Sequence, residues 1–306
     1  MEMNIIQPST KHDPIIKDYF ELLKPRVMAL AIFTAAVGMV VAKTPVHPVI
    51  VLASLLCIAC GAGACGALNM WWDSDIDAHM ERTRNRPIPS QRISREQSLV
   101  LGVILGIFSV SFLSIFANIL AASLLLATIL FYTIVYTMLL KRTTHHNIVI
   151  GGVSGALPPM VGWAVATNSI SYESVLLFMI IFSWTPAHFW ALALFHTMDY
   201  SKAGVPMLTV TAGDRSTRNQ IAIYTALLVI LSSALSFTSV GGWFYAAAST
   251  ILNGFFIFYT LRVFFSDSNS SKASDFRCEK RLFRYSILYL FLIFLALVLE
   301  RFLIVL

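Results

Sequence analysis

The chain has 306 residues, of which 57% are hydrophobic and 12% charged, and its mean hydropathy is +0.74. A soluble globular domain carries about 25% charged residues, so this composition excludes a water-soluble enzyme, a disordered chain and a disulfide-stapled secreted module. The net charge of +6 does not indicate nucleic-acid binding, because the basic residues stand in short clusters between apolar runs. The remaining class is a polytopic membrane protein, and the polar, mixed-charge residues 1–26 show no pattern of a cleavable signal peptide.

Nine apolar runs are long enough to cross a membrane as helices, since a hydrocarbon core of ~30 Å needs about 20 residues. None has the alternating pattern of a short barrel strand. We therefore predict an all-α fold, with one nine-helix transmembrane domain over 27–306 after a cytoplasmic segment over 1–26. The predicted spans are 27–42, 48–72, 98–117, 119–140, 148–167, 173–195, 220–240, 243–265 and 284–306.

The distribution of Lys and Arg predicts the orientation of these spans. Of the 22 Lys and Arg residues, all except Lys43 and Arg301 fall on one side of the nine-span arrangement. The positive-inside rule puts that side in the cytoplasm, with the N-terminus, and puts the C-terminus on the opposite side. We expect a multi-pass protein of a bacterial inner (plasma) membrane or an equivalent membrane, surrounded by membrane lipid.

The second span ends in a cluster of acidic residues. At 100° per residue, Asn69, Asp73 and Asp77 are i, i+4 neighbours on one helix face, whereas Asp75 points roughly the opposite way. These carboxylates repel one another, and they stand at a helix C-terminus, where the macrodipole disfavours negative charge. A divalent cation would resolve both problems, and Mg²⁺ is typically held by one or two carboxylates together with substrate phosphates. A solvated acidic turn is the alternative interpretation of the same residues.

The basic residues that follow favour the phosphate interpretation. Arg82, Arg84 and Arg86 come directly after the acidic cluster. Carboxylates for a metal followed by cations for phosphate oxygens suit a diphosphate bound through Mg²⁺. The same arginines also have a simpler interpretation as topology determinants.

The later spans contain further polar or helix-breaking residues. Asn147 opens the fifth span, either as a helix cap or as the wall of a polar site, and Pro158-Pro159 must interrupt that helix. His188 lies at membrane depth beside Pro186, where an ionisable residue indicates function unless the proline-freed carbonyl satisfies it. The Ser-rich, charged segment 266–283 predicts a flexible loop.

An ordered set of sequence blocks resembles the UbiA family of intramembrane prenyltransferases and, within it, the branch that farnesylates protohaem IX. The blocks span about the first two thirds of the chain: Leu23–Val27, Asn69–Thr83, Tyr136–Thr144, Asn147–Gly152, Gly155–Trp163, Trp184–Trp190 and Asp199–Leu208. The resemblance implies the UbiA helical bundle with a central cavity open to the cytoplasmic side. It implies transfer of a farnesyl group from farnesyl diphosphate to a vinyl group of haem b, with addition of water, giving haem O and diphosphate.

The resemblance also implies a site. Asn69, Asp73 and Asp77 would hold Mg²⁺ and act in catalysis with Lys141, Arg142 and Asp199. The expected substrate-binding residues are Lys24, Arg26, Arg82, Arg86, Asn147, His188, His196 and Lys202. A haem A synthase or a terminal oxidase assembly is the protein partner that such an activity suggests.

One departure from the wider family concerns its second acidic motif. His196 occupies a position that the broader family fills with an aspartate, which leaves Asp199 as the acid there and weakens the case for a second Mg²⁺. A neutral imidazole or Lys202 suits an acceptor with iron and propionates better than another carboxylate does. Two other functions stay open: a UbiA-type enzyme acting on a quinone precursor or chlorin, and a cation-coupled membrane transporter.

Overall fold

The computed structural model describes residues 15–305, and every regular element in this range is a helix, as predicted. Residues 1–14 of the predicted N-terminal segment lie outside the described residues. The elements are α1 (Ile16–Leu22), α2 (Pro25–Val41), α3 (Pro48–His79), α4 (Arg95–Phe116), α5 (Ile119–Leu130), the π-helix η1 (Phe131–Leu140), α6 (Asn147–Ala156), α7 (Pro158–Thr167), α8 (Tyr172–Phe195), α9 (Thr197–Lys202), α10 (Leu208–Thr211), α11 (Gly213–Ala234), the 3₁₀ turn η2 (Leu235–Phe237), α12 (Trp243–Phe264), α13 (Ser268–Ala273) and α14 (Arg277–Val305).

Among the described residues, eight helical segments are long and apolar enough to cross a membrane. A ninth is obtained when α1 and α2, which meet at a bend of 57°, count as one span. The predicted spans fall on these helices, but three helices extend well beyond their apolar runs: α3 continues to His79, α11 begins at Gly213 and α14 begins at Arg277. Polar residues continue a helix outside the hydrocarbon, because each added residue completes another backbone hydrogen bond.

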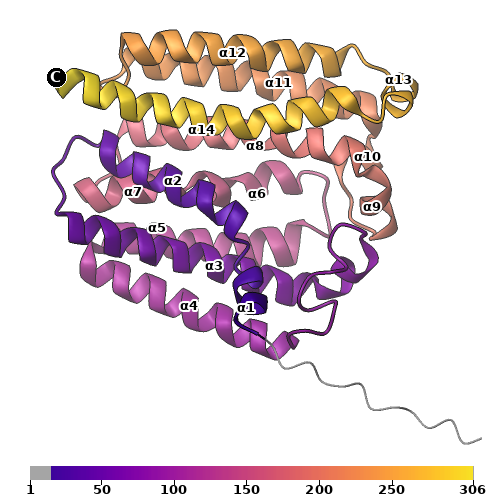
Figure 1. The fold of residues 1–306 in the computed structure, drawn as a ribbon, viewed down its shortest axis with the longest axis horizontal. Coiled ribbons are helices and arrows are strands. Elements are labelled where there is room, and N and C mark those ends of the chain that lie inside the picture. The colour runs from indigo at the N-terminus through magenta and orange to yellow at the C-terminus, as the bar shows by residue number, and fades with distance from the viewer. Residues whose placement is uncertain (1–14, 306) are drawn as a thin grey trace, which may run out of the picture.

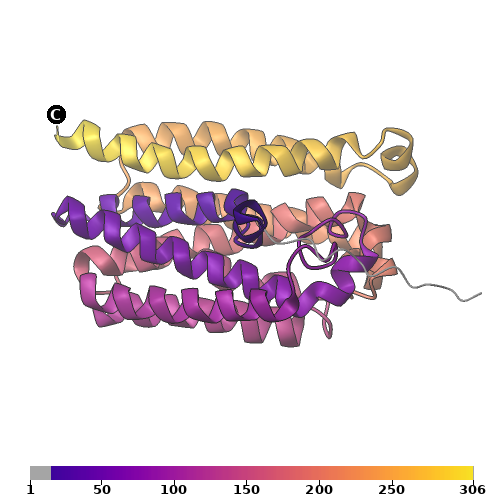
Figure 2. The ribbon, with the colours of Figure 1, turned by 60° about the horizontal axis from the view of Figure 1, so that its bottom comes forward.

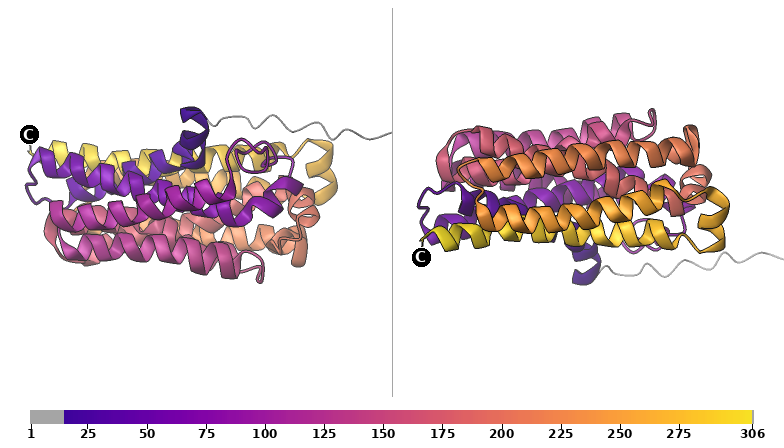
Figure 3. Two further views of the ribbon diagram at one scale, coloured as in Figure 1. Left: turned by 90° about the horizontal axis from the view of Figure 1, so that it is seen from below. Right: turned by 90° about the horizontal axis from the view of Figure 1, so that it is seen from above.

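The long helices lie roughly side by side, with the polar connections gathered at one end (Figures 1 and 2). We call this the polar end and define it by the segments 80–94, 141–146, 196–212 and 265–276. Along the bundle α3 packs on α4, α2 on α7, and α8 on both α11 and α14 (Figure 3). The grouping of these connections agrees with the sorting of Lys and Arg, and the cytoplasmic orientation of the polar end remains a prediction.

Helix α2 and helix α7 touch through their backbones. A Cβ added at Gly162 would lie 1.9 Å from the carbonyl oxygen of Ala35, and one added at Gly38 would lie 2.1 Å from that of Pro159. Helix α7 begins at Pro158 after the chain leaves α6, so the proline pair interrupts the fifth span as predicted. The two glycines allow the broken span to pack directly against α2.

The predicted loop over 266–283 is the main difference from the expected fold. It contains α13 and the first turns of α14. Arg218 of α11 is 2% exposed and donates to Glu279 Oε1 over 3.0 Å and to the hydroxyl of Ser271 over 2.9 Å. This buried ion pair ties the segment to the bundle, and neither partner reveals it in the local sequence.

Candidate active site

The acidic stripe, which we define as Asn69, Asp73 and Asp77, lies on the buried face of the last turns of α3. The three residues are 4%, 0% and 1% exposed, whereas the side chain of Asp75 is 56% exposed. Helical geometry persists through this segment, so the predicted separation of Asp75 from the other two carboxylates is what the structure has.

Asn69 connects three parts of the chain at the buried end of the stripe. Its amide nitrogen donates to Asp73 Oδ2 over 2.7 Å and to Thr137 Oγ1 over 3.1 Å, and Lys24 Nζ donates to its amide oxygen over 2.5 Å. Lys24 has a φ of 53°, a left-handed conformation that costs free energy in a non-glycine residue and tends to persist at functional sites. The sequence reasoning missed Thr137, although it stands inside one of the quoted blocks.

Lys141 and Arg142 reach opposite sides of α3 from the end of η1. Lys141 Nζ lies 2.5 Å from Asp73 Oδ2, whereas Arg142 forms a bidentate pair with Asp75 at 2.7 Å and stands 3.6 Å from Asp73 Oδ1. The backbone N–H of Lys141 donates to the carbonyl of Tyr136, five residues earlier, so the wider π-type turn sets the direction of Lys141.

The connection after α3 supplies a third cation. Arg86 Nη1 lies 2.6 Å from Asp77 Oδ2, and Thr83 Oγ1 donates to the carbonyl oxygen of Asp77 over 2.9 Å. Burial raises the pKa of Tyr200 on α9, and the charge of Arg82, which lies near its hydroxyl, partly offsets that rise. Of the predicted arginines, Arg86 therefore contacts the acidic stripe, whereas Arg82 lies near Tyr200 of α9.

Three basic side chains, those of Lys24, Lys141 and Arg86, contact the acidic stripe, which itself contains two carboxylates. Asp73 Oδ1 is buried without a hydrogen bond. The basic residues that surround the stripe, with their long lysine and arginine side chains, suit an anionic ligand such as a diphosphate.

The residues of the stripe also fit a metal ion shared with such a ligand. Across residues 15–305, no cluster of three or more His, Cys, Asp or Glu side chains is arranged to hold a metal alone. Mg²⁺ is usually bound by one or two carboxylates, substrate phosphates and waters, so two carboxylates and one amide are the donor set expected for it.

Asn147, at the first position of α6, is 0% exposed, and neither atom of its amide makes a hydrogen bond. An unsatisfied buried polar group costs about 1–3 kcal/mol. His146 occupies the N-cap position of α6, and the Asn147 side chain bonds to none of the described residues, which argues against the helix-cap interpretation and favours a ligand-facing role.

A second group of predicted residues lies between α8 and α9. His196 Nδ1 is 3.5 Å from Asp199 Oδ2, and burial, assisted by the charge of Arg82, lowers the pKa of His196 below its ordinary value. The lowered pKa favours the neutral imidazole, the form expected to suit an acceptor with iron and propionates. Lys202 and Arg26 are exposed, and the ion pairs of the acidic stripe do not include them.

The sequence profile of the UbiA prenyltransferase family matches residues 31–299. The chain belongs to this family. A protoheme IX farnesyltransferase from Roseobacter denitrificans is 52% identical over 294 residues, which cover 96% of this chain and 94% of that protein. One from Cereibacter sphaeroides is 53% identical over 283 residues, covering 92% and 91%.

Solved structures share the fold at much lower identity. A digeranylgeranylglyceryl phosphate synthase structure matches with a TM-score of 0.75 and 18% identity over 94% of this chain and 98% of that chain. A UbiA homolog from Archaeoglobus fulgidus bound to GPP and Mg²⁺ matches with a TM-score of 0.62 and 15% identity over 92% and 99%. These similarities confirm the predicted UbiA-type helical bundle.

Proposed function

We propose that the protein transfers the farnesyl group of farnesyl diphosphate to a vinyl group of haem b, with addition of water, giving haem O and diphosphate. The observation that carries this proposal is the buried acidic stripe with cations from three separate segments around it. The relatives named protoheme IX farnesyltransferase, which match over more than nine tenths of both chains, support the choice of farnesyl donor and haem acceptor.

In this proposal the diphosphate end of the donor binds at the acidic stripe. Asn69, Asp73 and Asp77 would hold Mg²⁺, which supplies positive charge to the phosphate oxygens as a Lewis acid does. Lys24, Lys141 and Arg86 leave their resting partners and donate to the diphosphate. Arg142 lies at the rim of the stripe, and Arg82, Asp199 and His196 lie on the side towards α9.

The chemical demand on these side chains follows from the bond that breaks. Cleavage of the allylic C–O bond leaves its electron pair on the diphosphate, and the allylic carbon gains positive character. The vinyl π electrons of the acceptor form the new C–C bond, and water adds to the resulting cationic carbon and loses a proton. Cations that donate to the leaving diphosphate stabilise the charge that develops there, and removal of a single such donor typically lowers the rate by about 10²–10³.

The test uses the full chain in detergent with haem b, farnesyl diphosphate and Mg²⁺. Mass analysis of the product and release of diphosphate are followed together. We expect haem O from the native protein, almost none from Asp73→Asn, and activity within about fivefold of native from Asp75→Asn, because exposed ion pairs contribute only ~0–1 kcal/mol. Product from a phenolic quinone precursor or a chlorin instead of haem b would contradict the acceptor. Failure to release diphosphate without an ion gradient would point to the transporter class.

We further propose that the polar end faces the cytoplasm of a bacterial inner membrane or its equivalent, with Mg²⁺ as cofactor and a haem A synthase or terminal oxidase assembly nearby. Labelling of single cysteines introduced at exposed Lys272 and exposed Lys43 in sealed cells tests the orientation. A membrane-impermeant reagent should reach position 43 and leave position 272 unlabelled, and the reverse pattern would invert the orientation.

A further inference from the structure

His188 lies on α8 within an aromatic cluster that also includes α14. The rings of Trp184 and Phe283 are nearly parallel to its imidazole, at angles of 14° and 23° and centroid distances of 4.4 and 4.7 Å. His188 Nδ1 is 2.7 Å from Ser286 Oγ, and Trp184 Nε1 donates to the carbonyl oxygen of Ser286 over 2.7 Å. These contacts fix the imidazole in one orientation.

The hydrogen bonds of Ser286 determine which ring nitrogen carries the proton. A serine hydroxyl has one proton to donate, and that of Ser286 donates to the carbonyl oxygen of Phe283 over 2.7 Å. Ser286 Oγ is therefore the acceptor in its contact with His188, and His188 Nδ1 is the donor. In a neutral imidazole the other nitrogen then has no proton, so Nε2 presents a lone pair.

No group among the described residues forms a hydrogen bond with Nε2, so this lone pair has no protein partner. His188 is only partly buried, although Trp184 and Phe283 cover ring surface and Ser286 occupies the Nδ1 edge. Most buried polar side-chain atoms have a hydrogen-bond partner, so a nitrogen without one needs an explanation. A histidine with one N–H held by the protein and the other nitrogen free has the arrangement of a metal-ligating imidazole.

We propose that Nε2 of His188 is the axial ligand to the iron of the haem acceptor. This inference rests on the proposed function, which supplies haem as the substrate. Ser286 is the positioning residue, because its hydroxyl sets the tautomer and the ring orientation. The aromatic surface around His188 suits the apolar face of a porphyrin, and His196 follows directly after the polar end of the same helix, α8.

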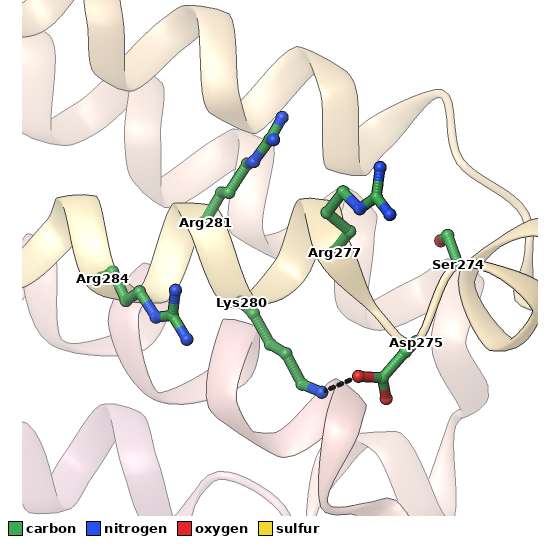
Figure 4. Close-up of a pocket in the computed structure, with 6 residues that line it drawn as sticks. All are labelled: Ser274, Asp275, Arg277, Lys280, Arg281 and Arg284. Carbon is green, nitrogen blue, oxygen red and sulfur yellow. Dashed lines mark hydrogen bonds and ion pairs between the residues drawn. The ribbon is translucent and has the colours of Figure 1, made fainter.

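A cation lies next to the same aromatic cluster, towards the polar end. Lys280 Nζ is 5.9 Å from the ring centroid of Phe195, and the ring of Phe195 packs edge-on against Phe283. Lys280 pairs with Asp275, whose side chain is 88% exposed, and such a surface pair is easily exchanged. Figure 4 shows this pair at the start of α14, next to the polar end, where Lys280 lines a pocket of about 320 Å³ with Arg277, Arg281 and Arg284. Lys280 is therefore placed to take a haem propionate.

The experiment is the absorption and resonance Raman spectrum of the full chain loaded with haem b, without farnesyl diphosphate. We expect an iron–imidazole signature in the native protein, its loss in His188→Gly, and its return when free imidazole is added. His47→Gly, at an exposed position on the opposite end of the bundle, is the matched control and should leave the spectrum unchanged. Rescue by imidazole separates loss of a ligand from loss of the fold.

A second variant tests the positioning residue. Ser286→Ala should weaken haem b binding about 10–100-fold while the thermal unfolding temperature of the ligand-free protein changes little, as removal of a metal ligand's hydrogen-bond partner typically does. An unchanged spectrum in His188→Gly, in a protein that still forms haem O, would overturn this inference and leave the proposed function standing. Failure of the native protein to take up haem b at all would instead contradict the proposed function.

Discussion

Replacement of Lys141 by Met is expected to change two binding reactions in opposite directions. Lys141 Nζ lies 2.5 Å from Asp73 Oδ2, and the two side chains are 13% and 0% exposed. At an effective dielectric constant of ~20, two unit charges about 4 Å apart attract by about 4 kcal/mol, so Lys141 competes strongly with any metal ion for this carboxylate. Methionine keeps much of the length of the side chain and removes its charge.

Two measurements follow from this competition. Without diphosphate, Lys141→Met should bind Mg²⁺ about tenfold more tightly or better, since each tenfold corresponds to 1.4 kcal/mol. With Mg²⁺ present, its dissociation constant for farnesyl diphosphate should rise about 10- to 150-fold, because a charge-assisted hydrogen bond contributes about 1.5–3 kcal/mol. Isothermal titration calorimetry in detergent measures both constants.

Lys272→Met is the control, because Lys272 is an exposed lysine of α13 and its loss should alter neither constant. The reasoning would be refuted if Lys141→Met weakened Mg²⁺ binding, or if it left the affinity for farnesyl diphosphate unchanged.

Three further predictions test the fold and the second group of site residues. Gly162→Ala should lower the unfolding temperature strongly because its Cβ would lie 1.9 Å from the Ala35 carbonyl oxygen, whereas Gly155→Ala, with no atom within 4 Å, should not. Asn147→Leu should raise the thermal stability of the ligand-free protein, since it removes an unsatisfied buried amide worth about 1–3 kcal/mol, yet lower turnover; a stable and fully active variant would contradict a ligand-facing role. The pKa of His196 is lowered in the folded state, so the unfolded chain binds more protons, and stability should fall as pH drops below about 6.5. That decline should be smaller in His196→Gln when unfolding temperatures are compared across pH.

Much of the fold could be predicted because the length of each apolar run and the positions of the charged residues follow from the thickness and sidedness of the membrane. The face shared by Asn69, Asp73 and Asp77 follows from helical periodicity alone, and the structure buries these three while Asp75 stays exposed. The break at Pro158 likewise follows from local chemistry. Helix ends were less predictable, because a helix can continue beyond the hydrocarbon. Helix α3, for example, extends seven residues past the predicted end of its span at Trp72.

The partners of the site residues depend on tertiary packing and had no local signal. Lys24 and Asn69 are 45 positions apart in the sequence, and Lys141 and Asp73 are 68 apart. Helical spacing cannot predict contacts at such separations. Arg142 appears equivalent to Lys141 in the sequence, yet it turns to Asp75. Ser286, 98 positions from His188, stands in an apolar helix with nothing to mark it.

The central claim is that the acidic stripe binds a divalent cation together with a diphosphate. Electron paramagnetic resonance of Mn²⁺ in place of Mg²⁺ tests it most directly, on native protein and on the Asp73→Asn/Asp77→Asn double variant. We predict that farnesyl diphosphate immobilises Mn²⁺ on the native protein with phosphorus hyperfine coupling, and that the double variant shows neither effect. The same coupled signal in the double variant would place the metal and the diphosphate elsewhere.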